Sequence, residues 1–505
     1  MTLSSETEMQ QPDEDWYDAT SEELQPNTWM WDSSSTWSTQ SELIMGEKEA
    51  GELVEELKKE CPVFHINGSQ VEVLTDPADF YQFLVEGCHR AKRRIIFSSL
   101  YLGNGPKSLE LLSALSESLE RCPDLEVRVL LDCLRGSRGH TGSPSSRHLL
   151  APLVQQHGER CQVSLYHTPT LRSFIKWLLP DRWNEVIGLQ HMKVYIFDDD
   201  LVISGANLND DYFTQRQDRY MVFRGAAHLA EFYTQLVAAV SRFSLQLTAD
   251  DQLKLSPSWS VHPYQGDLSK FCELARAELE AVLAGWRRSP PAPPAAADTW
   301  VLPTVNLAPV GIDLDERVTR RLLRADLLKG DVHLATGYFN LTDANMAELS
   351  AGQPRPVSVL CAHPEANGFL RAGDVSGYIP AAYTYLLHRF HAALPAHSGV
   401  TLHEYRRPGW TFHSKGVWSH AAGETGLPSA TVIGSSNLGY RSSYRDLESQ
   451  VVVVTKNAAL RHALADERRK LYCHSQPVDG STFARPDRFV PRWVRLVSRL
   501  IRHFF

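Results

Sequence analysis

Two short segments, one in each half of the chain, carry a histidine and a lysine two residues apart. His191 and Lys193 stand in GLQHMKVYIFDD (188–199), and His413 and Lys415 stand in WTFHSKGVW. Side chains on a strand alternate between its faces, so each histidine is expected to point to the same side as its lysine. An imidazole and an ammonium are costly to bury without partners. The spacing therefore indicates a polar site on a stiff element.

Each His-x-Lys segment is followed by an Asn-Leu pair and then by an acid. Asn207 precedes Asp218 by eleven residues, and Asn437 precedes Glu448 by eleven residues. One such segment alone is explained as well by a core histidine with satisfied hydrogen bonds. Two copies at matched distances are hard to explain by packing, and they indicate one function that uses both halves.

These residue types suit the chemistry of phosphate esters. A neutral histidine is a nucleophile when a carboxylate fixes its tautomer, and Asp218 and Glu448 are the candidate acids for His191 and His413. The two lysines and two asparagines supply positive charge and N–H donors for a five-coordinate phosphorus. We predict that His191 attacks phosphorus while His413 acts as general acid and then as base. The intermediate is a phosphohistidine, and no metal is obligatory, although stimulation by a divalent cation is compatible with this chemistry.

Other paired segments show that the chain is doubled. Three β-rich runs in the first half have counterparts in the second: 93–105 with 330–342, 125–133 with 355–363, and 161–169 with 400–408. Amphipathic helical stretches lie between these runs. Strands that alternate with helices predict an α/β fold. We expect two similar halves, each a mixed β-sheet flanked by helices, with one active site at their interface.

Composition divides the chain into five parts. Residues 1–50 hold twelve acidic residues and one lysine, which accounts for the net charge of −9 and leaves the rest close to neutral. The eight cysteines are scattered, with no zinc or disulfide pattern. The predicted parts are a disordered acidic tail (1–60), a first half (61–286), a Pro/Ala-rich linker (287–298), a second half (299–480) and a basic amphipathic C-terminal helix (481–505).

HMKVYIFD resembles the His-x-Lys-x4-Asp motif of the phospholipase D superfamily, on His191, Lys193 and Asp198. The second copy, HSKGVWSH, keeps the histidine and lysine but has Ser419 and His420 near the position of the acid. We therefore expect Asp198, although part of the catalytic motif, mainly to support the structure. The two half-motifs of this superfamily imply a single two-histidine active site.

Within the superfamily the chain resembles the eukaryotic CDP-diacylglycerol–glycerol-3-phosphate 3-phosphatidyltransferases. The resemblance rests on LLDCLRGSRG, GLQHMKVYIFD, SGANLNDDYFTQRQDRY, GYFNLT, PGWTFHSKGVW and GSSNLGYRSSYRDLE, and runs from about residue 62 to the C-terminus. It implies CDP-diacylglycerol as phosphatidyl donor, glycerol 3-phosphate as acceptor, and a place on the matrix face of the mitochondrial inner membrane. The acidic N-terminus is the opposite of an Arg-rich presequence.

Two loops are candidate ligand sites. GNGPKS follows a strand and precedes a helix, so its backbone N–H groups could bind phosphate. The resemblance implies a nucleotide there, the CDP moiety or ATP, on Gly103, Asn104, Gly105, Lys107 and Ser108. Arg135 and Arg138 lie in LRGSRG, where an arginine fork could bind the phosphate of glycerol 3-phosphate or the diphosphate. A solvated basic turn explains these two arginines equally well.

Two segments are candidate membrane contacts. PRWVRLVSRLIRHFF at the C-terminus places four arginines, Arg492, Arg495, Arg499 and Arg502, on one helical face, with Trp493, Leu496, Val497, Leu500 and Phe504 on another. LRSFIKWLLPDRW (171–183) is similarly aromatic. Either could lie in an anionic bilayer surface or pack on the core.

Three alternative functions follow from the same residues. Within the superfamily, the protein could be a cardiolipin synthase, a phosphatidylserine synthase or a hydrolytic phospholipase D. A phosphodiesterase acting on DNA should carry basic patches. Because the body of the chain is nearly neutral, we expect no nucleic-acid partner. A non-catalytic membrane scaffold is disfavoured by the two complete His-Lys-Asn sets.

Overall fold

Strands from the first half form one sheet in the computed structural model, which describes residues 40–139, 143–172, 184–324, 326–351, 355–370, 377–424 and 426–504. Its strand order is β11-β10-β5-β4-β3-β6-β7-β9-β2. The strands are β2 (Val71–Leu74), β3 (Arg94–Ser98), β4 (Glu126–Asp132), β5 (Cys161–Tyr166), β6 (Val194–Phe197), β7 (Asp200–Ser204), β9 (Tyr220–Phe223), β10 (Leu245–Leu247) and β11 (Leu253–Leu255).

The second sheet repeats this order. It runs β1-β12-β20-β19-β18-β14-β15-β16-β21, with β13 beside β12. In both sheets the three strands that precede the histidine segment are mutually parallel and the later ones antiparallel. The strands are β1 (Phe64–Ile66), β12 (Thr299–Leu307), β13 (Ile312–Asp313), β14 (Val332–Thr336), β15 (Val357–Ala362), β16 (Val400–Tyr405), β18 (Gly416–Ser419), β19 (Ala430–Gly434), β20 (Glu448–Thr455) and β21 (Ser475–Val478). The predicted α/β fold with two similar mixed sheets is confirmed.

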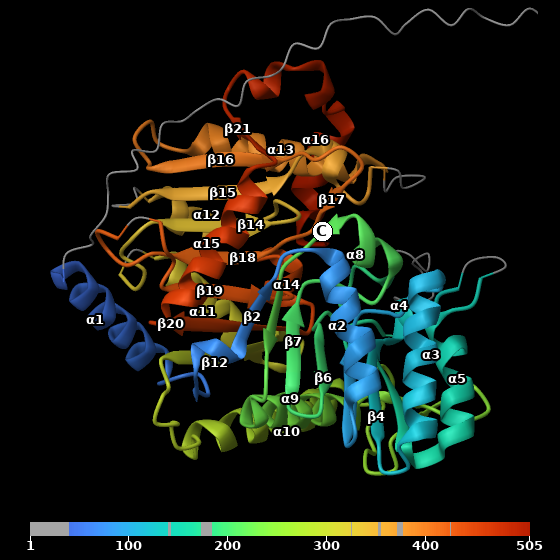
Figure 1. Cartoon of the computed structure of the whole chain (residues 1–505). Coiled ribbons are helices and arrows are strands. Elements are labelled where there is room, and N and C mark those ends of the chain that lie inside the picture. Colours follow the sequence, from blue (N-terminus) through green and yellow to red (C-terminus); the bar gives the residue numbers. More distant parts are fainter. Residues whose placement is uncertain are drawn as a thin grey trace, which may run out of the picture. The chain divides into compact units, whose positions relative to one another are not determined.

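Helices cover both sheets. In Figure 1, α2, α3 and α5 lie beside the strands of the first sheet, and α9 and α10 cross below them, whereas α15 lies against the second sheet. The helices of the first half are α2 (Pro77–Arg90), α3 (Pro106–Arg121), α4 (Cys133–Ser137), α5 (Ser146–His157), α8 (Asp210–Thr214), α9 (Ala227–Arg242) and α10 (Leu268–Arg288). Those of the second half are α11 (Leu314–Leu323), α12 (Asp343–Ser350), α13 (Ile379–Ala393), α14 (Tyr440–Tyr444), α15 (Ala458–Tyr472) and α16 (Arg492–Ile501).

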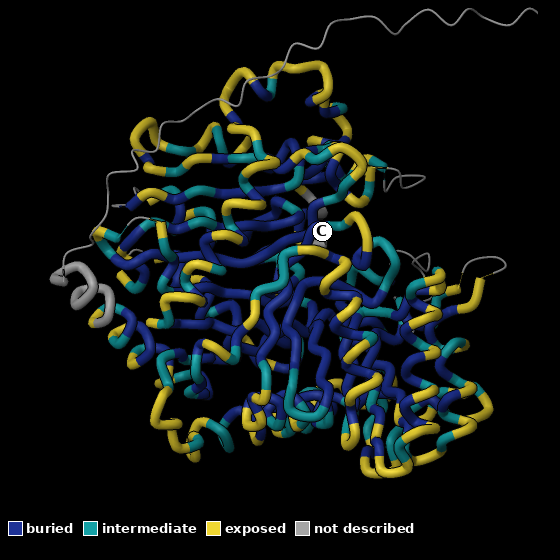
Figure 2. Tube along the Cα trace, in the orientation of Figure 1, coloured by how far each residue is buried: buried dark blue, intermediate teal, exposed yellow. Residues whose placement is uncertain are grey.

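One hydrophobic core joins the two halves. It includes Val194 and Ile196 from the first sheet and Val451 and Val453 from the second. Figure 2 shows that the buried residues follow the strands of both sheets, while exposed residues lie mainly on the outer faces of the helices. Because both sheets contribute to a common core, the two halves form one unit, which comprises Gln40–Phe505.

A buried ion pair adds to this joint. Arg219, beside β9, donates to Glu467 of α15 through Nε and Nη2, each at 2.8 Å, and its Nη1 donates to the carbonyl of Val432. Both charged side chains are almost fully buried. Charges are buried at low cost only when they are paired and hydrogen-bonded, so this contact fixes one orientation of the halves.

Four predicted boundaries are corrected. Residues 1–39 of the predicted tail lie outside the described residues, but Gln40–Leu57 forms helix α1, whose Leu53 and Leu57 are buried. The strand β1 belongs to the second sheet although it lies in the predicted first half, because Phe64–Ile66 pairs with β12. This pairing covers an edge that would otherwise expose unpaired backbone groups. The predicted linker (287–298) begins two residues too early, since α10 continues to Arg288 and residues 289–298 contain no helix or strand. The predicted C-terminal helix (481–505) is shorter, since α16 spans Arg492–Ile501.

Candidate active site

The backbone ahead of each histidine is hydrogen-bonded to the opposite half. His191 N donates to the carbonyl of Leu447 at 2.8 Å, and Leu447 N donates to the carbonyl of Leu189 at 2.8 Å. In the matching position, His413 N donates to the carbonyl of Gln217 at 2.8 Å. Strand β17 (Thr411–Phe412) pairs with β8 (Arg216–Gln217) next to it. Each histidine is thereby held beside the residue that precedes the acid of the other half.

The histidine–acid pairs are consequently crossed. Nδ1 of His191 lies 3.0 Å from both carboxylate oxygens of Glu448, and Nδ1 of His413 lies 2.6 Å from Oδ2 of Asp218. The sequence predicts these two acids, but their assignment to the histidine of the same half is wrong. The exchange follows from the backbone bonds between the halves. It leaves Nε2 of each ring as the atom available for chemistry.

The strand expected to hold His191 is shorter than predicted. Strand β6 begins at Val194, so His191 and Lys193 precede it. The alternation still holds, since Met192, Val194 and Ile196 enter one core cluster and Tyr195 enters the other. Release from the sheet is what lets the residue ahead of β6 bond to the opposite half.

Both lysines fold back onto the histidine segments. Nζ of Lys193 donates to the carbonyl of His191 at 2.6 Å, and Nζ of Lys415 donates to the carbonyl of His413 at 2.7 Å. Nζ of Lys415 also lies 3.2 Å from Nε2 of its histidine. Gly205 makes room for this lysine, because a Cβ there would come within 2.6 Å of the lysine Cδ. Nζ of Lys415 thus lies at the imidazole, 2.7 Å from Nδ1 of His413, whereas Nζ of Lys193 contacts the backbone of its histidine segment.

The two asparagines differ in their contacts. Nδ2 of Asn207 donates to the hydroxyl of Tyr212 at 3.1 Å. That hydroxyl lies 3.4 Å from Nε2 of His413. Oδ1 of Asn437 is buried and has no hydrogen-bond partner among the described residues. A buried polar atom without a hydrogen bond is costly unless a ligand or a water molecule supplies the bond. Asn437 is therefore a candidate contact for substrate.

Burial sets the protonation of the histidine pair. It lowers the pKa of both His191 and His413 well below the usual value, and the neighbouring Lys193 and Lys415, respectively, lower it further. Burial also raises the pKa of Glu448. Both imidazoles are therefore neutral at physiological pH, which is the form that can attack phosphorus or accept a proton.

Burial also shifts the other charged groups of the site, and it lowers the pKa of Lys193 well below its usual value. Burial lowers the pKa of Lys415 to about 8, and it raises the pKa of Asp218 to about 6. Shifted pKa values of this kind cluster at functional sites. Two imidazoles, each held by a carboxylate and flanked by a lysine, can serve as nucleophile and proton carrier around one phosphorus.

Asp198 supports the backbone, as the loss of its counterpart predicts. It follows β6 with a positive φ of 54°. Its carboxylate accepts hydrogen bonds from the backbone N–H groups of Lys92, Arg93 and Arg94, at 2.8 to 3.1 Å. Its position at the end of β6 away from His191 removes it from the catalytic set and makes it a structural member of the motif.

The predicted nucleotide loop is already occupied by an internal carboxylate. Asp210 accepts from Lys107 N at 3.0 Å, from Ser108 N at 3.1 Å and from the hydroxyl of Ser108 at 2.7 Å. A Cβ at Gly105 would meet the same carboxylate at 2.6 Å. Nδ2 of Asn104 donates to the carbonyl of Pro144. The prediction of a nucleotide site on Gly103, Asn104, Gly105, Lys107 and Ser108 depended on free backbone N–H groups, and those of Lys107 and Ser108 are bonded to an acid distant in sequence.

The two arginines of the LRGSRG segment have different surroundings. Arg138 forms an ion pair with Glu185 at 2.7 Å. The guanidinium of Arg135 lies 4.1 Å over the ring of Tyr101. This tyrosine occupies the same place in the first repeat as Tyr338 in the second. Because it stacks on an aromatic ring beside the end of β3, Arg135 stays a candidate for phosphate binding, whereas Arg138 is engaged in an ion pair.

Several residues of the site were not predicted. Tyr212 and Ser442 stand five residues after Asn207 and Asn437, and Ser442 donates to Glu448 at 2.6 Å. Ser435 donates to the same carboxylate. Aligning the two repeats beyond the asparagine would have marked these positions, although the alignment cannot give the roles, because the residues differ between the halves.

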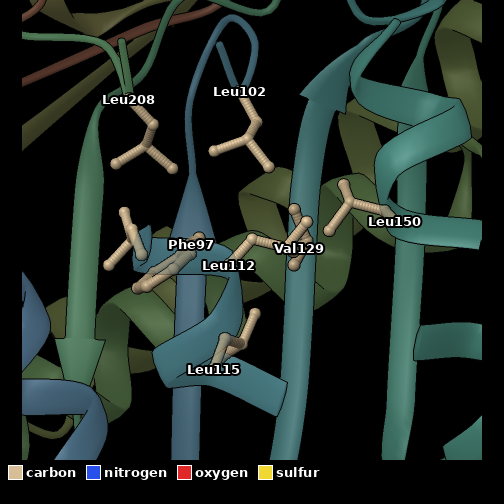
Figure 3. Close-up of a pocket in the computed structure, with 8 residues that line it drawn as sticks. Phe97, Leu102, Leu112, Leu115, Val129, Leu150 and Leu208 are labelled. Carbon is tan, nitrogen blue, oxygen red and sulfur yellow. The ribbon is translucent and has the colours of Figure 1, made fainter. Parts of the chain in front are cut away.

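The described residues hold few other candidate ligand sites. Within the described ranges, no group of three or more His, Cys, Asp or Glu side chains could hold a metal ion. The cavity in Figure 3, of about 10 Å³, is lined only by apolar side chains such as Phe97, Val129 and Leu150. It is a packing defect too small for a ligand. Along the described part of the chain, every helix is too short or too polar to cross a bilayer.

Comparison with known proteins gives extensive matches. The chain is 44% identical over 483 residues to the mitochondrial CDP-diacylglycerol–glycerol-3-phosphate 3-phosphatidyltransferase of chicken, covering 88% of this chain and 85% of that protein. It is 42% identical over 481 residues to the human protein of the same name, covering 88% and 84%. A probable enzyme of this type from Dictyostelium discoideum is 33% identical over 94% of this chain and 83% of its own length. No family model matches.

A solved structure also matches the fold. Phosphatidylserine synthase of Haemophilus influenzae aligns with a TM-score of 0.69 at 19% identity, over 90% of this chain and all of that one. Paired sheets, two His-x-Lys segments and crossed carboxylates define an enzyme of the phospholipase D type. The identity with the vertebrate proteins narrows the class: the chain belongs to the CDP-diacylglycerol–glycerol-3-phosphate 3-phosphatidyltransferase family.

Proposed function

We propose that the protein transfers the phosphatidyl group of CDP-diacylglycerol to glycerol 3-phosphate through a covalent adduct on His191. The products are CMP and phosphatidylglycerophosphate, the precursor of phosphatidylglycerol and cardiolipin. The observation that carries the proposal is the pair of buried imidazoles whose Nδ1 atoms are held by Glu448 and Asp218. Hydrogen bonding at Nδ1 leaves the lone pair on Nε2, where a nucleophile or base needs it.

The first displacement forms the adduct. Nε2 of His191 attacks the phosphorus that carries diacylglycerol, an N–P bond forms, and the P–O bond to CMP breaks. Glu448 stabilises the positive charge that the ring gains. Lys193 and Lys415 stabilise the anionic oxygens of the five-coordinate phosphorus. His191 is the better nucleophile of the two, since its side chain is 11% exposed against 4% for His413.

The second displacement releases the lipid product. Nε2 of His413 takes the proton from a hydroxyl of glycerol 3-phosphate, the hydroxyl oxygen attacks phosphorus, and the N–P bond to His191 breaks. The contacts of His413 suit a proton carrier, because Asp218 holds its Nδ1 and the hydroxyl of Tyr212 lies 3.4 Å from its Nε2. After this step the His191 ring is neutral, and the His413 ring carries the proton, which it loses to solvent before the next turnover.

Intact-mass measurement tests the proposal. Donor lipid supplied without acceptor should give a mass increase of one phosphatidyl group on the wild type, located on His191 by peptide mapping. His191→Asn should show no adduct and no CMP release. An adduct on His413, or turnover in His191→Asn, would overturn the assignment. Absence of phosphatidylglycerophosphate when wild type receives both substrates would overturn the proposed function itself.

We propose that no metal is obligatory, because Lys193 and Lys415 supply the positive charge at the phosphate oxygens. Product formation by the wild type should persist after treatment with EDTA. A stimulation by added Mg²⁺ on top of that rate is compatible with an effect on the anionic donor lipid. Complete loss in EDTA with recovery on adding metal would contradict this part of the proposal.

Exposed apolar side chains near the C-terminus suit contact with a bilayer. Phe489, Trp493 and Leu496 are 74%, 44% and 62% exposed, and the ring of Trp493 lies 4.8 Å from that of Tyr378. Helix α16 is anchored through Val494, which packs on α13. We propose that this face, flanked by exposed arginines, lies in the membrane surface that supplies the donor. The other candidate, 171–183, lies almost wholly outside the described residues.

The relatives from chicken and human are named as mitochondrial proteins. We propose that this protein acts on the matrix face of the mitochondrial inner membrane. Fractionation of cells that express a tagged full-length chain tests the location. The protein should resist protease both in intact mitochondria and in mitoplasts, whose outer membrane has been removed. It should be digested only after detergent opens the inner membrane. A cytosolic signal would contradict the proposal.

A further inference from the structure

The ion pair that follows each asparagine is inverted between the two repeats. In the first half, Asp211 and Arg216 stand four and nine residues after Asn207 and lie 3.1 Å apart. In the second half the same positions hold Arg441 and Asp446, also 3.1 Å apart. The inversion places a guanidinium two residues before one acid and a carboxylate two residues before the other. The two sides of the active site therefore hold the same pair of charges in exchanged positions, although their backbones match.

The carboxylate of the second pair has a structural task. Asp446 is buried and accepts from the backbone N–H of Leu189 at 2.9 Å, which helps to hold the segment ahead of His191. Arg216 cannot accept such a bond. Its Nε donates to the hydroxyl of Thr411 at 3.0 Å, and Nη2 faces Asp211, whose side chain is 49% exposed. Nη1 of Arg216 makes no hydrogen bond within the described part of the chain.

Arg216 lies on the side of His413. Its guanidinium is 4.6 Å from the centroid of the Tyr212 ring, and the His413 ring is 5.2 Å from the same centroid. The ring of Tyr338 lies 5.6 Å from that of His413. Gly368 leaves space between these groups, since a Cβ there would come 3.2 Å from Nη2 of Arg216 and 3.5 Å from the hydroxyl of Tyr338.

We infer that Arg216 binds the phosphate group of the acceptor. The inference rests on the proposed function, in which His413 deprotonates the acceptor hydroxyl, so that the acceptor must lie on the side of that ring. Glycerol 3-phosphate carries its phosphate at the end of a three-carbon chain. When the hydroxyl at the other end lies at Nε2 of His413, we expect the phosphate to lie beyond Tyr212, at the guanidinium of Arg216. A phosphate monoester carries a charge of about −1.5 to −2 near neutral pH and suits the fork of an arginine.

Asp211 acts in this scheme as the partner of Arg216 when the acceptor is absent. Its exposed carboxylate can turn to solvent at low cost, because exposed ion pairs contribute little. The subsite therefore selects an alcohol that carries a phosphate over water, serine or glycerol. Arg216 is a binding residue for the second displacement only.

Steady-state transfer to glycerol 3-phosphate and to glycerol tests the inference, with the variants Arg216→Gln and Asp211→Asn. Arg216→Gln should reduce kcat/KM for glycerol 3-phosphate by about 10- to 100-fold, as expected for a lost charged hydrogen bond. The rate with glycerol should change less than threefold. Asp211→Asn should leave KM for glycerol 3-phosphate unchanged or lower it. Thermal unfolding of both variants checks that each is folded.

Two results would overturn the inference. In one, Arg216→Gln keeps the wild-type KM for glycerol 3-phosphate. In the other, the two variants lose activity equally with both acceptors, which is the behaviour of a structural ion pair. A failure of the proposed function looks different, because the wild type itself would then transfer nothing to glycerol 3-phosphate. If Arg216→Gln does not fold, Arg216→Lys, which keeps the charge but not the fork, should raise KM for glycerol 3-phosphate selectively.

Discussion

The crossed pairing predicts that the two acids act on different steps of the reaction. Glu448→Gln keeps a hydrogen-bond acceptor at the Nδ1 of His191 but removes the negative charge 3.0 Å away. Asp218→Asn makes the equivalent change at His413, across a 2.6 Å contact. Both carboxylates are fully buried, where a charge is poorly screened and its loss has a large effect. The two variants are thus matched in chemistry and environment.

The size of each effect follows from the leaving groups. Forming the N–P bond puts positive charge on the His191 ring, so Glu448→Gln should slow adduct formation about 10³-fold, equivalent to about 4 kcal/mol. CMP leaves as a phosphate whose pKa is about 6, so it needs little help from a general acid. A glycerol hydroxyl needs a base. Asp218→Asn should therefore leave adduct formation within about tenfold of wild type and slow the second step about 10³-fold.

Rapid quenching with radiolabelled donor separates the steps. Asp218→Asn should release a burst of about one equivalent of CMP per enzyme and accumulate the phosphatidyl adduct, while Glu448→Gln should show neither. Reversed behaviour would refute the crossed assignment, because it would mean that Asp218 orients the nucleophile. Equal loss of the burst in both variants would refute the separation of roles, since a general acid would then be needed to expel CMP.

Three further predictions concern pH, stability and the membrane face. Activity requires Asp218 to be ionised and Lys415 to be protonated. It should therefore fall below pH about 6, the pKa of Asp218 raised by burial, and above pH about 8, the pKa of Lys415 lowered by burial. A profile of kcat against pH checks both limbs, and Asp218→Asn should remove the acidic limb. Arg219→Ala leaves Glu467 buried without its partner and should lower the free energy of unfolding by about 3–5 kcal/mol in urea titration, whereas a loss under 1 kcal/mol would contradict the buried pair. Leu496→Ser should weaken binding to vesicles of phosphatidylcholine and an anionic phospholipid about tenfold in sedimentation, given about 1.5–3 kcal/mol for burying a leucine; unchanged sedimentation would contradict the membrane face.

A matched control exists for the membrane experiment. Leu109 on α3 is also partly exposed, at 42%, but lies in the first half on a different face. Leu109→Ser should leave vesicle binding unchanged. Equal loss in both serine variants would indicate non-specific adsorption rather than a directed membrane face.

The sequence by itself determined the chemistry and the doubled architecture. The residue types of the two His-x-Lys segments, and the equal spacing from asparagine to acid, identify phosphorus chemistry without any coordinates. The absence of an acid at Ser419 and His420 also predicts the structural role of Asp198, since a group missing from one copy cannot be essential to both. Short apolar runs between helical stretches predict the strands, because strands that are buried on both faces are apolar along their whole length.

Only the tertiary structure decided which groups meet. The pairing of His191 with Glu448, 257 residues away, depends on backbone bonds between the halves. The capping of α3 by Asp210 likewise removed a phosphate loop that local sequence favours. Both contacts join segments distant in the chain, and spacing along a chain fixes the face of an element but not its neighbour in space. The sequence shows that the ion pairs of the two repeats are inverted, but only the structure places Arg216 on the side of His413.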